Sequence, residues 1–341
     1  MPAELNLFSP IELRGVTARN RLWVSPMCQY SVFAEDGVPA AWHMVHLGSR
    51  AVGGAGLIIT EASAVEARGR ISARDVGLWN EAQATAYAPI VRFLREYGAV
   101  PAVQLAHAGR KAQVPGSIAP SALPFDSMPV PKEMGAGEIA AVVSAFQRGA
   151  ALALQAGFQV VEIHAAHGYL LHEFLSPLSN RRTDQYGGSF ENRIRFLSEV
   201  VVAVRGFWPA NLPLFVRISA TDWLEGGWDV DQSVALAKHL APLGVDLIDV
   251  SSGGLSAEQR IPLSPGYQVS FAERIKREAG IAVGAVGLIT GATQADAIVK
   301  EGRADAVLIA RQSLRDPYWP LRAARELGYD VPVPFQYQRA W

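Results

Sequence analysis

Short apolar runs alternate with longer amphipathic stretches along most of the chain. Each run is about the length of a buried strand, and most are apolar on both faces, as in parallel sheets covered on both sides. The runs predict eight strands, over Leu22–Met27, Gly56–Glu61, Val100–Leu105, Val160–His164, Leu214–Ser219, Leu247–Ser251, Ile281–Val286 and Ala306–Ile309. The longer stretches predict helices over Ala41–Val52, Ala82–Tyr97, Glu138–Ala156, Glu191–Phe207, Ser233–Leu243, Phe271–Glu278, Ala292–Lys300 and Trp319–Leu327.

Eight strands and eight helices in strict alternation predict an α/β fold of the (β/α)8 TIM-barrel type. An open doubly wound sheet usually has fewer strands. No Pro/Ser-rich linker divides the chain, so we expect one domain over residues 1–341. Long loops are predicted at Ala108–Ala136 and His167–Phe190, and a docked tail, rich in proline and aromatic residues, at about 329–341.

Barrel active sites lie at the C-terminal ends of the strands. Three residues with functional side chains follow the fourth strand, namely His164, His167 and Tyr169. Two neutral imidazoles can donate hydrogen bonds to one oxygen and polarise a carbonyl or nitro group. A phenol with an ordinary pKa of about 10 can deliver a proton. The alternatives are interior histidines, a packing tyrosine, or zinc ligands, although zinc needs about three protein ligands.

Two further residues at strand ends have several interpretations. Cys28 is a buried small hydrophobe, a weak S–H donor to a bound cofactor, or, least favoured, a nucleophile, since no thiol-enzyme motif accompanies it. Arg217 brings a cation into the barrel mouth after an apolar run, and a buried charge is costly unless paired. We therefore expect an anionic group beside Arg217, with an ion pair to Glu61 or Asp249 as the purely structural alternative.

The ends of the last two strands favour anion binding. Many barrels bind phosphate there, and Gly287, Ala310 and Arg311 offer backbone N–H groups and a guanidinium. No GxGxxG motif follows a strand, so neither a Rossmann dinucleotide domain nor a P-loop is supported.

Composition limits the partners and the compartment. The 341 residues include 31 basic and 32 acidic side chains, a formal net charge of -1, which argues against nucleic acid or an anionic membrane as the main partner. Cys28 is the single cysteine, which fits a reducing compartment. Residues Met1–Leu13 do not read as a secretory signal, and no apolar stretch approaches the roughly 20 residues of a membrane span. We expect a soluble, cytoplasmic protein.

The strand-end motifs closely resemble those of the Old Yellow Enzyme family of flavin-dependent ene-reductases. The matching stretches run in order along essentially the whole chain and include Ser25-Pro26-Met27-Cys28-Gln29-Tyr30, Gln104-Leu105-Ala106-His107-Ala108-Gly109-Arg110-Lys111, His164-Ala165-Ala166-His167-Gly168-Tyr169-Leu170, Ser179-Asn180-Arg181-Arg182-Thr183-Asp184 and Gly284-Ala285-Val286-Gly287. Cys28 with Tyr30, the histidine pair and the ending Gln336-Tyr337-Gln338-Arg339-Ala340-Trp341 resemble the bacterial thermophilic-like class.

The resemblance implies non-covalent FMN at the top of the barrel. The residues that it implies at the flavin are Ser25, Pro26, Met27, Cys28, Ala62, Gln104 and Arg217, with Gly287, Ala310 and Arg311 at the phosphate. Arg217 would face N1 and the C2 oxygen of the flavin, which supplies the anion expected beside it. The family more often has Gly-Arg at Ala310-Arg311, and a backbone N–H survives this change.

The resemblance also implies a reaction in two halves. NAD(P)H, more specifically NADPH, reduces the flavin, and hydride then passes to the β-carbon of a small activated alkene. His164 and His167 would hold the oxygen of the alkene's carbonyl or nitro group, Tyr169 would protonate the α-carbon, and Tyr30 would touch the substrate. Arg339 would reach a neighbouring subunit's site in a homodimer or homotetramer. No metal ion is expected.

Two other functions are compatible with the residues alone. A metal-dependent barrel hydrolase would use His164, His167 and a carboxylate, and chelators would inhibit it. A flavin- or phosphate-binding module would have lost turnover, against which the intact set of two histidines and Tyr169 argues.

Overall fold

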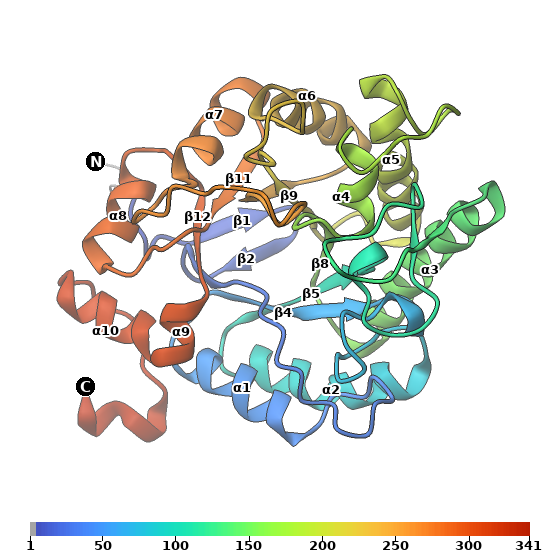
Figure 1. The fold of residues 1–341 in the computed structure, drawn as a ribbon. Coiled ribbons are helices and arrows are strands. Elements are labelled where there is room, and N and C mark those ends of the chain that lie inside the picture. The colour runs from blue at the N-terminus through green and yellow to red at the C-terminus, as the bar shows by residue number, and fades with distance from the viewer. Residues whose placement is uncertain (1–4) are drawn as a thin grey trace.

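Eight parallel strands close into a barrel at the centre of the molecule (Figure 1). The computed structural model describes residues 5–341, so the first four residues of the predicted N-terminal stretch and of the single domain lie outside it. In order around the barrel the strands are β3 (Leu22–Val24), β4 (Leu57–Ala64), β5 (Val100–Ala106), β8 (Val160–Ala165), β9 (Leu214–Ser219), β10 (Leu247–Ser251), β11 (Ala282–Ala285) and β12 (Ala306–Ile309). Because β12 pairs in parallel with β3, the sheet has no free edge.

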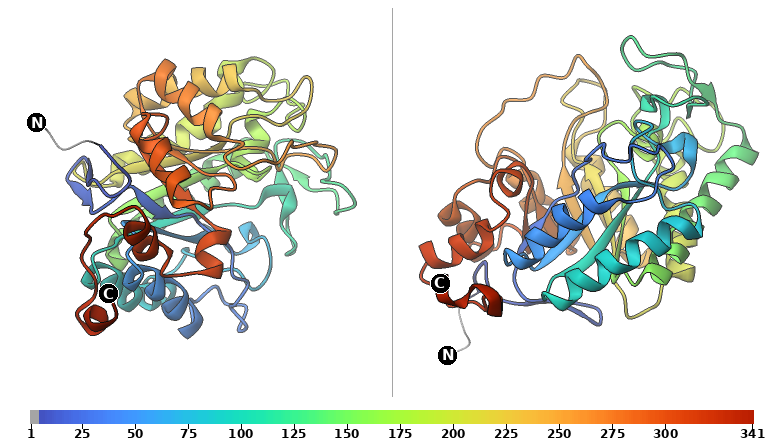
Figure 2. Two further views of the ribbon diagram at one scale, coloured as in Figure 1. Left: turned by 90° about the vertical axis from the view of Figure 1, so that its left-hand side faces the viewer. Right: turned by 90° about the horizontal axis from the view of Figure 1, so that it is seen from below.

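Helices surround the barrel, as the two further views in Figure 2 show. They are α1 (Ala41–Val52), α2 (Glu81–Glu96), α3 (Ala136–Ala156), α5 (Phe190–Phe207), α6 (Val230–Leu240), α7 (Val269–Ala279), α8 (Ala292–Lys300) and α10 (Trp319–Glu326). Asn80, Ser189 and Asp229 cap three of them by accepting a backbone N–H bond. Each helix overlaps a predicted one, so the (β/α)8 prediction is confirmed.

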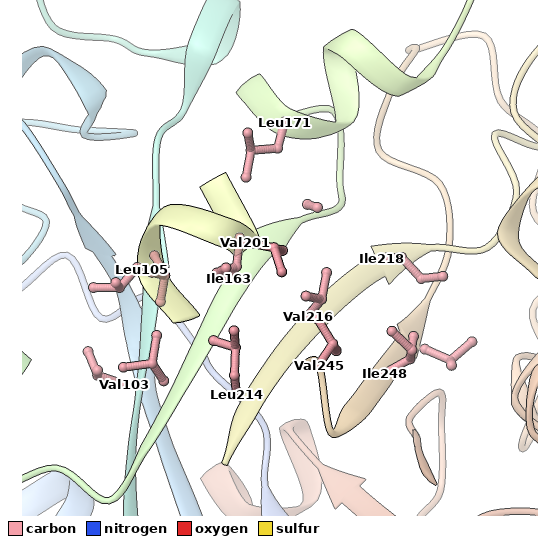
Figure 3. Close-up of a cluster of buried hydrophobic side chains, with 14 of the residues drawn as sticks. Val103, Leu105, Ile163, Leu171, Val201, Leu214, Val216, Ile218, Val245 and Ile248 are labelled. Carbon is pink, nitrogen blue, oxygen red and sulfur yellow. The ribbon is translucent and has the colours of Figure 1, made fainter. Parts of the chain in front are cut away.

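Alternation along the strands divides the core into two parts. Outward side chains such as Leu105, Ile163 and Val216 belong to the main cluster between the strands and the helices (Figure 3). Inward side chains near the strand starts form a second cluster, in which Trp23 stacks on Phe215 with ring centroids 5.8 Å apart. This second cluster fills the lower barrel and leaves polar inward positions toward the C-terminal ends of the strands.

Several short elements were not predicted from the sequence. They are the hairpin of β1 (Ile11–Leu13) and β2 (Val16–Ala18), the pair β6 (Ile118–Ala119) and β7 (Lys132–Glu133), helices α4 (Leu170–Leu175) and α9 (Arg311–Arg315), and the 3-10 turns η1 (Ala67–Gly69), η2 (Gly109–Lys111) and η4 (Phe335–Ala340). A fourth turn, η3 (Ala241–Leu243), lies within the helix predicted over Ser233–Leu243. The hairpin adds Ile11 and Val16 to the second cluster and so covers the end of the barrel opposite the mouth. The first barrel strand ends at Val24, not Met27, since Pro26 offers no N–H for a ladder.

Helix α3 corrects one expectation. Its 21 residues are long and apolar enough to match the composition of a membrane span, with a mean hydropathy of 1.3. The sequence prediction that no stretch approaches this length was therefore wrong. In the barrel, half of this stretch is buried, and the helix packs against α2, α5 and β5. Its apolar face is therefore explained by packing inside the fold.

Candidate active site

Neighbouring strands deliver the predicted polar side chains to one end of the barrel. His164 of β8 is paired in register with Arg217 of β9, and Asp249 of β10 is paired with the same arginine. Gln104 of β5 is paired with Glu162 of β8. All five side chains are polar and buried, so the interior of the barrel is polar at this end.

The two histidines and Tyr169 lie together at this mouth. The His164 ring centroid is 5.2 Å from that of His167 and 5.1 Å from that of Tyr169. Burial, followed by the Arg217 charge, holds the pKa of both imidazoles well below the usual range. Burial raises the pKa of the Tyr169 phenol. Both rings are therefore neutral at pH 7, and the phenol keeps its proton.

The backbone of His167 is held in an uncommon conformation. Its φ of 59° lies in the left-handed region, which bulky residues rarely adopt. The His167 N–H donates to Ser219 Oγ at 2.9 Å, and its carbonyl accepts from Lys111 Nζ at 2.9 Å. His167 Nε2 lies 2.7 Å from Ser251 Oγ. Three side chains thus fix this residue, and the sequence interpretation assigned a role to none of them.

A second set of contacts orders the loop after His167. The Gly168 N–H donates to His172 Nδ1 at 2.9 Å, so the other nitrogen of that ring carries the proton and faces Asp222 Oδ1 at 2.9 Å. Ser176 Oγ donates to the other oxygen of the Asp222 carboxylate. Both His172 and Asp222 are fully buried, so these contacts are shielded from water, and they flank Tyr169 at the start of α4.

Lys111 brings a cation close to the Tyr169 ring. Its Nζ lies 5.0 Å from the centre of the Tyr169 ring and also donates to the Gly254 carbonyl at 2.9 Å. Burial lowers the pKa of Lys111 to about 8, while the Glu173 carboxylate opposes this shift. A signal for Lys111 existed in the sequence, because it follows the third strand within the motif Gly109-Arg110-Lys111.

Cys28 and Tyr30 lie on the segment that follows β3. Burial, reinforced by the Glu61 carboxylate, raises the pKa of the Cys28 thiol, which also forms hydrogen bonds with Tyr30 and with the backbone of Ala62. A thiol held protonated is a poor nucleophile, so the nucleophile interpretation of Cys28 is not supported. Tyr30 is 47% exposed and has a φ of 52°.

Arg217 has a carboxylate beside it. Its Nε is 3.1 Å from Asp249 Oδ2, although the N–H is not aimed at that oxygen. The predicted structural alternative, an ion pair, is thus present with Asp249 and not with Glu61. Glu61 instead accepts the Gln29 N–H at 2.8 Å and lies 3.3 Å from His43.

A cavity of about 180 Å³ opens where β11 and β12 end. It is lined by the predicted Gly287, Ala310 and Arg311, and also by residues that the sequence interpretation did not include, among them Ser251, Gln268, Gln312 and Arg315. Gly287 has a φ of 130°, and a Cβ there would lie 3.0 Å from Gln268 Nε2. Because the first N–H groups of α9 have no partner within the helix, this cavity suits an anion.

Comparisons with known proteins show the family of this chain. Residues 6–329 match the model of the NADH:flavin oxidoreductase / NADH oxidase family. An NADPH dehydrogenase of Geobacillus sp. (strain WCH70) is 54% identical over 340 residues, which cover 99% of this chain and 99% of that protein. The chain belongs to this family, the Old Yellow Enzymes.

Solved structures of the family have the same architecture. Morphinone reductase in complex with tetrahydroNAD is 29% identical, with a TM-score of 0.81 over 96% of this chain and 92% of that chain. The Old Yellow Enzyme homologue from Zymomonas mobilis is 27% identical, with a TM-score of 0.80 over 96% and 93%. The family assignment makes the chain a flavin oxidoreductase and accounts for the barrel.

The residues of this family member suit a flavin nucleotide. Ser25 Oγ is buried and has no hydrogen-bond partner within residues 5–341, so a donor or acceptor is available beneath the mouth. The guanidinium of Arg217 is buried close to Glu162 and Asp249 and can meet a second anion. The cavity lined by Gly287, Ala310 and Arg311 can take the phosphate. One region of the barrel mouth thus offers sites for the ring and for the phosphate.

Arg339 is the one predicted site residue that lies away from this mouth. It is exposed on η4, whose contacts run to Tyr97 and Tyr318. Tyr97 precedes the start of β5, so the tail docks toward the opposite end of the barrel. Arg339 makes no hydrogen bond or ion pair with the other residues between 5 and 341. Over the same range, no group of three or more His, Cys, Asp or Glu side chains is arranged to hold a metal ion.

Proposed function

We propose that the chain is an FMN-dependent ene-reductase that uses NADPH and acts on small alkenes conjugated to a carbonyl or nitro group. The observation that carries this proposal is the convergence of two neutral imidazoles and one protonated phenol at the barrel mouth. NADPH as the reductant is supported by the name of the Geobacillus relative.

FMN would be held by the residues named above. Ser25, Cys28 and Gln104 would contact the ring together with Pro26, Met27 and Ala62, and Arg217 would neutralise negative charge at its edge. Gly287, Ala310 and Arg311 would hold the phosphate. When bound, FMN would accept a hydride from NADPH and later supply one to the alkene.

His164 and His167 would bind the substrate oxygen. The Ala166 N–H donates to His164 Nδ1 at 3.3 Å, so the proton of this neutral ring is on Nε2, which is left to donate to a ligand. A neutral imidazole near Arg217 can polarise an oxygen without adding another positive charge to this buried site. One such oriented donor contributes roughly 10²–10³ in rate in comparable oxyanion sites.

Tyr169 would deliver the proton to the α-carbon. Its ring lies beside His164 and under the Lys111 ammonium, so the hydroxyl is held at the same mouth as the substrate oxygen. The nearby Lys111 cation would stabilise the phenolate that remains after transfer, since the pKa of the free phenol is raised by burial. Tyr30, on the exposed rim, would contact the far side of the substrate.

We also propose that the enzyme works as a homodimer or homotetramer in the cytoplasm, with Arg339 of one subunit near the mouth of another. Two observations support the assembly. Arg339 has no partner within the described residues of its own chain, and the tail exposes apolar side chains, with Phe335 82% exposed. Small activated alkenes, rather than nucleic acid or membrane, are the proposed partners.

Replacing His164 with alanine tests this function. The variant should remain yellow, because His164 is not among the residues that would hold FMN, yet it should lose phenol binding and at least about 100-fold in enone reduction. The exposed His239 on α6 gives a matched control, and His239→Ala should behave as the native enzyme. Native-rate enone reduction by His164→Ala would refute the oxygen-binding role.

A further inference from the structure

A layer of polar side chains crosses the barrel interior directly beneath the histidine pair. Below it the inward positions are apolar, and Phe215 and Leu247 belong to the cluster that fills the lower barrel. Two residues further along the same strands, and on their neighbours, the inward residues are Gln104, Glu162, Arg217 and Asp249. A core that is otherwise apolar therefore contains two carboxyl groups and one guanidinium.

Both carboxyl groups are completely buried, with 0% of Glu162 and 0% of Asp249 exposed. Gln104 Nε2 donates to Glu162 Oε1 at 2.7 Å. Glu162 Oε2 and Asp249 Oδ1 have no hydrogen-bond partner within residues 5–341. A packing role alone does not explain these oxygens, because unpaired buried polar atoms are costly and apolar side chains of similar size are usually at least as stabilising.

The charges in this layer do not balance if every group is ionised. Two carboxylates and one guanidinium leave one negative charge in a volume that water does not reach. Asp249 is the partner of Arg217, with 3.1 Å between the charged atoms. Burial, and then the nearby Asp249 carboxylate, raise the pKa of Glu162 to about 8, against the opposing effect of Arg217.

Other groups around Glu162 do not change this balance. Arg217 from β9 and Asp249 from β10 are the charged groups that act on it, and Gln104 from β5 is uncharged. His164, two residues further along β8, is neutral because burial and Arg217 lower its pKa. Burial raises the pKa of Asp249 too, but Asp249 lies 3.1 Å from Arg217 Nε, whereas Glu162 has no ion pair within residues 5–341. Glu162 is therefore the group whose proton responds when another negative charge approaches Arg217.

We propose that Glu162 and Asp249 form a proton-storing pair beneath Arg217, in which Glu162, at a pH where it is still ionised, takes up a proton when the bound flavin is reduced to its anion. This inference rests on the proposed FMN site. Reduction adds two electrons and one proton to the flavin and leaves one negative charge beside Arg217. The second proton comes from solvent and converts the Glu162 carboxylate into the acid. Glu162 thus balances the charge beside Arg217 and does not touch the substrate.

The pH dependence of the flavin midpoint potential tests this proposal. Below about pH 8 Glu162 already carries its proton, and reduction takes up one proton per two electrons. A tenfold change in an equilibrium constant is about 30 mV for a two-electron couple, so the midpoint potential should fall by about 30 mV per pH unit. Above about pH 8 a second proton is taken up, and the slope should double to about 60 mV per pH unit.

The experiment is a spectroelectrochemical titration of the FMN-loaded protein with dithionite between pH 6.5 and 9.5. Native protein should show a break from the shallow to the steep slope. Glu162→Gln preserves the acceptor for Gln104 and should keep the shallow slope at every pH. Asp249→Asn removes the repulsion that raises the pKa of Glu162, so the break should move to lower pH.

Glu173→Gln is the matched control. Glu173 is also fully buried with a pKa raised by burial to about 8, but it lies on α4 outside the barrel and bonds to the Arg110 N–H. This variant should keep the native break. Infrared difference spectra on reduction above pH 8 give a second readout. A carboxylic-acid C=O band should appear in native protein and be absent in Glu162→Gln.

Two failures can be told apart. If the protein binds no FMN, the proposed function falls and this inference falls with it. If FMN binds and is reduced but native protein shows one shallow slope over the whole range, the proton-storing pair is overturned while the proposed function stands. A break that persists in Glu162→Gln would assign the proton to another group and would likewise overturn the proposal.

Discussion

His167 Nε2 lies 2.7 Å from the Oγ of Ser251, the last residue of β10. Ser251 also lines the cavity at Gly287 and Arg311, so one hydroxyl connects the proposed oxygen site to the proposed phosphate site. A hydrogen bond to one ring nitrogen fixes the tautomer and the orientation of an imidazole. Ser251 is therefore the residue that prepares His167 for a substrate oxygen.

Replacing Ser251 with alanine should weaken binding of a para-substituted phenol to the FMN-loaded protein about fivefold. This corresponds to one net hydrogen bond of about 1 kcal/mol. Optical titration of the flavin band measures the Kd. Ser252→Ala provides a control, since the neighbouring buried hydroxyl donates to Gln268 and not to His167. Unchanged or tighter phenol binding in Ser251→Ala would show that His167 is positioned without this contact.

Tyr169→Phe should separate the two halves of the reaction. Loss of a positioned general acid typically costs 10²–10⁴-fold, so we expect enone reduction to fall by about that factor while NADPH oxidation in the absence of enone keeps its native rate. Rapid-mixing absorbance records each half separately. Because Tyr169 is at the N-cap of α4 without a side-chain bond there, the hydroxyl can be removed without loss of a cap. Equal loss in both halves would contradict the proton-donor role.

Arg311→Ala should weaken FMN binding by about 10- to 100-fold, because a charge-assisted bond to phosphate is stronger than a neutral hydrogen bond. Flavin fluorescence during reconstitution of the apoprotein measures the Kd for FMN. Riboflavin, which lacks the phosphate, supplies the comparison, and its affinity should be the same in native and variant protein. A parallel loss of riboflavin affinity would mean that the substitution disturbs the ring site instead.

The buried histidines should lower stability as the pH drops from 7 to 5, while the raised pKa values of Glu162 and Glu173 act in the opposite direction. The pKa values of His46, His164 and His167 are lowered in the folded protein, chiefly by burial, to about 3 for His46. The unfolded chain, with histidine pKa values near 6.5, therefore binds more protons below that pH. Each histidine that stays neutral in the folded protein lowers the free energy of unfolding at pH 5 by up to about 2 kcal/mol relative to pH 7.

Urea denaturation at the two pH values checks this sign. His167→Asn cannot take up the proton, so the difference between pH 7 and pH 5 should shrink by up to about 2 kcal/mol relative to the native protein. His239→Asn, on the outer surface of α6, should leave the difference unchanged. A pH 7 to pH 5 difference that is the same in His167→Asn as in the native protein would contradict the buried, neutral state of this ring.

The sequence predicted the barrel because its signal is local and repeated eight times. Apolar runs such as Leu214–Ser219 indicate the strands, and their alternation with helices indicates the barrel topology. The hairpin β1–β2 has three-residue strands, too short for a periodic pattern, and was missed. The end of β3 was placed three residues too late because the run continues to Met27 while Pro26 stops the ladder.

The site was predicted less completely, for a different reason. Residues in recognisable strand-end motifs, such as His164 and Arg311, could be named. Their contacts with side chains from elsewhere could not be predicted, because those of Lys111 and Ser251 with His167 span 56 and 84 residues. Glu162 had a local signal, an acidic residue at an inward position of a buried strand, but its partner on β5 is defined only by the closed sheet.

The most direct test of the account is one anaerobic sequence of visible spectra on the purified, FMN-loaded protein. We expect NADPH to bleach the flavin absorbance and cyclohexenone, added next, to restore it with formation of cyclohexanone. His164→Ala should be bleached in the same way and should recover at least about 100-fold more slowly. A native protein that binds no flavin, or whose bleached flavin is not reoxidised by the enone, would contradict it.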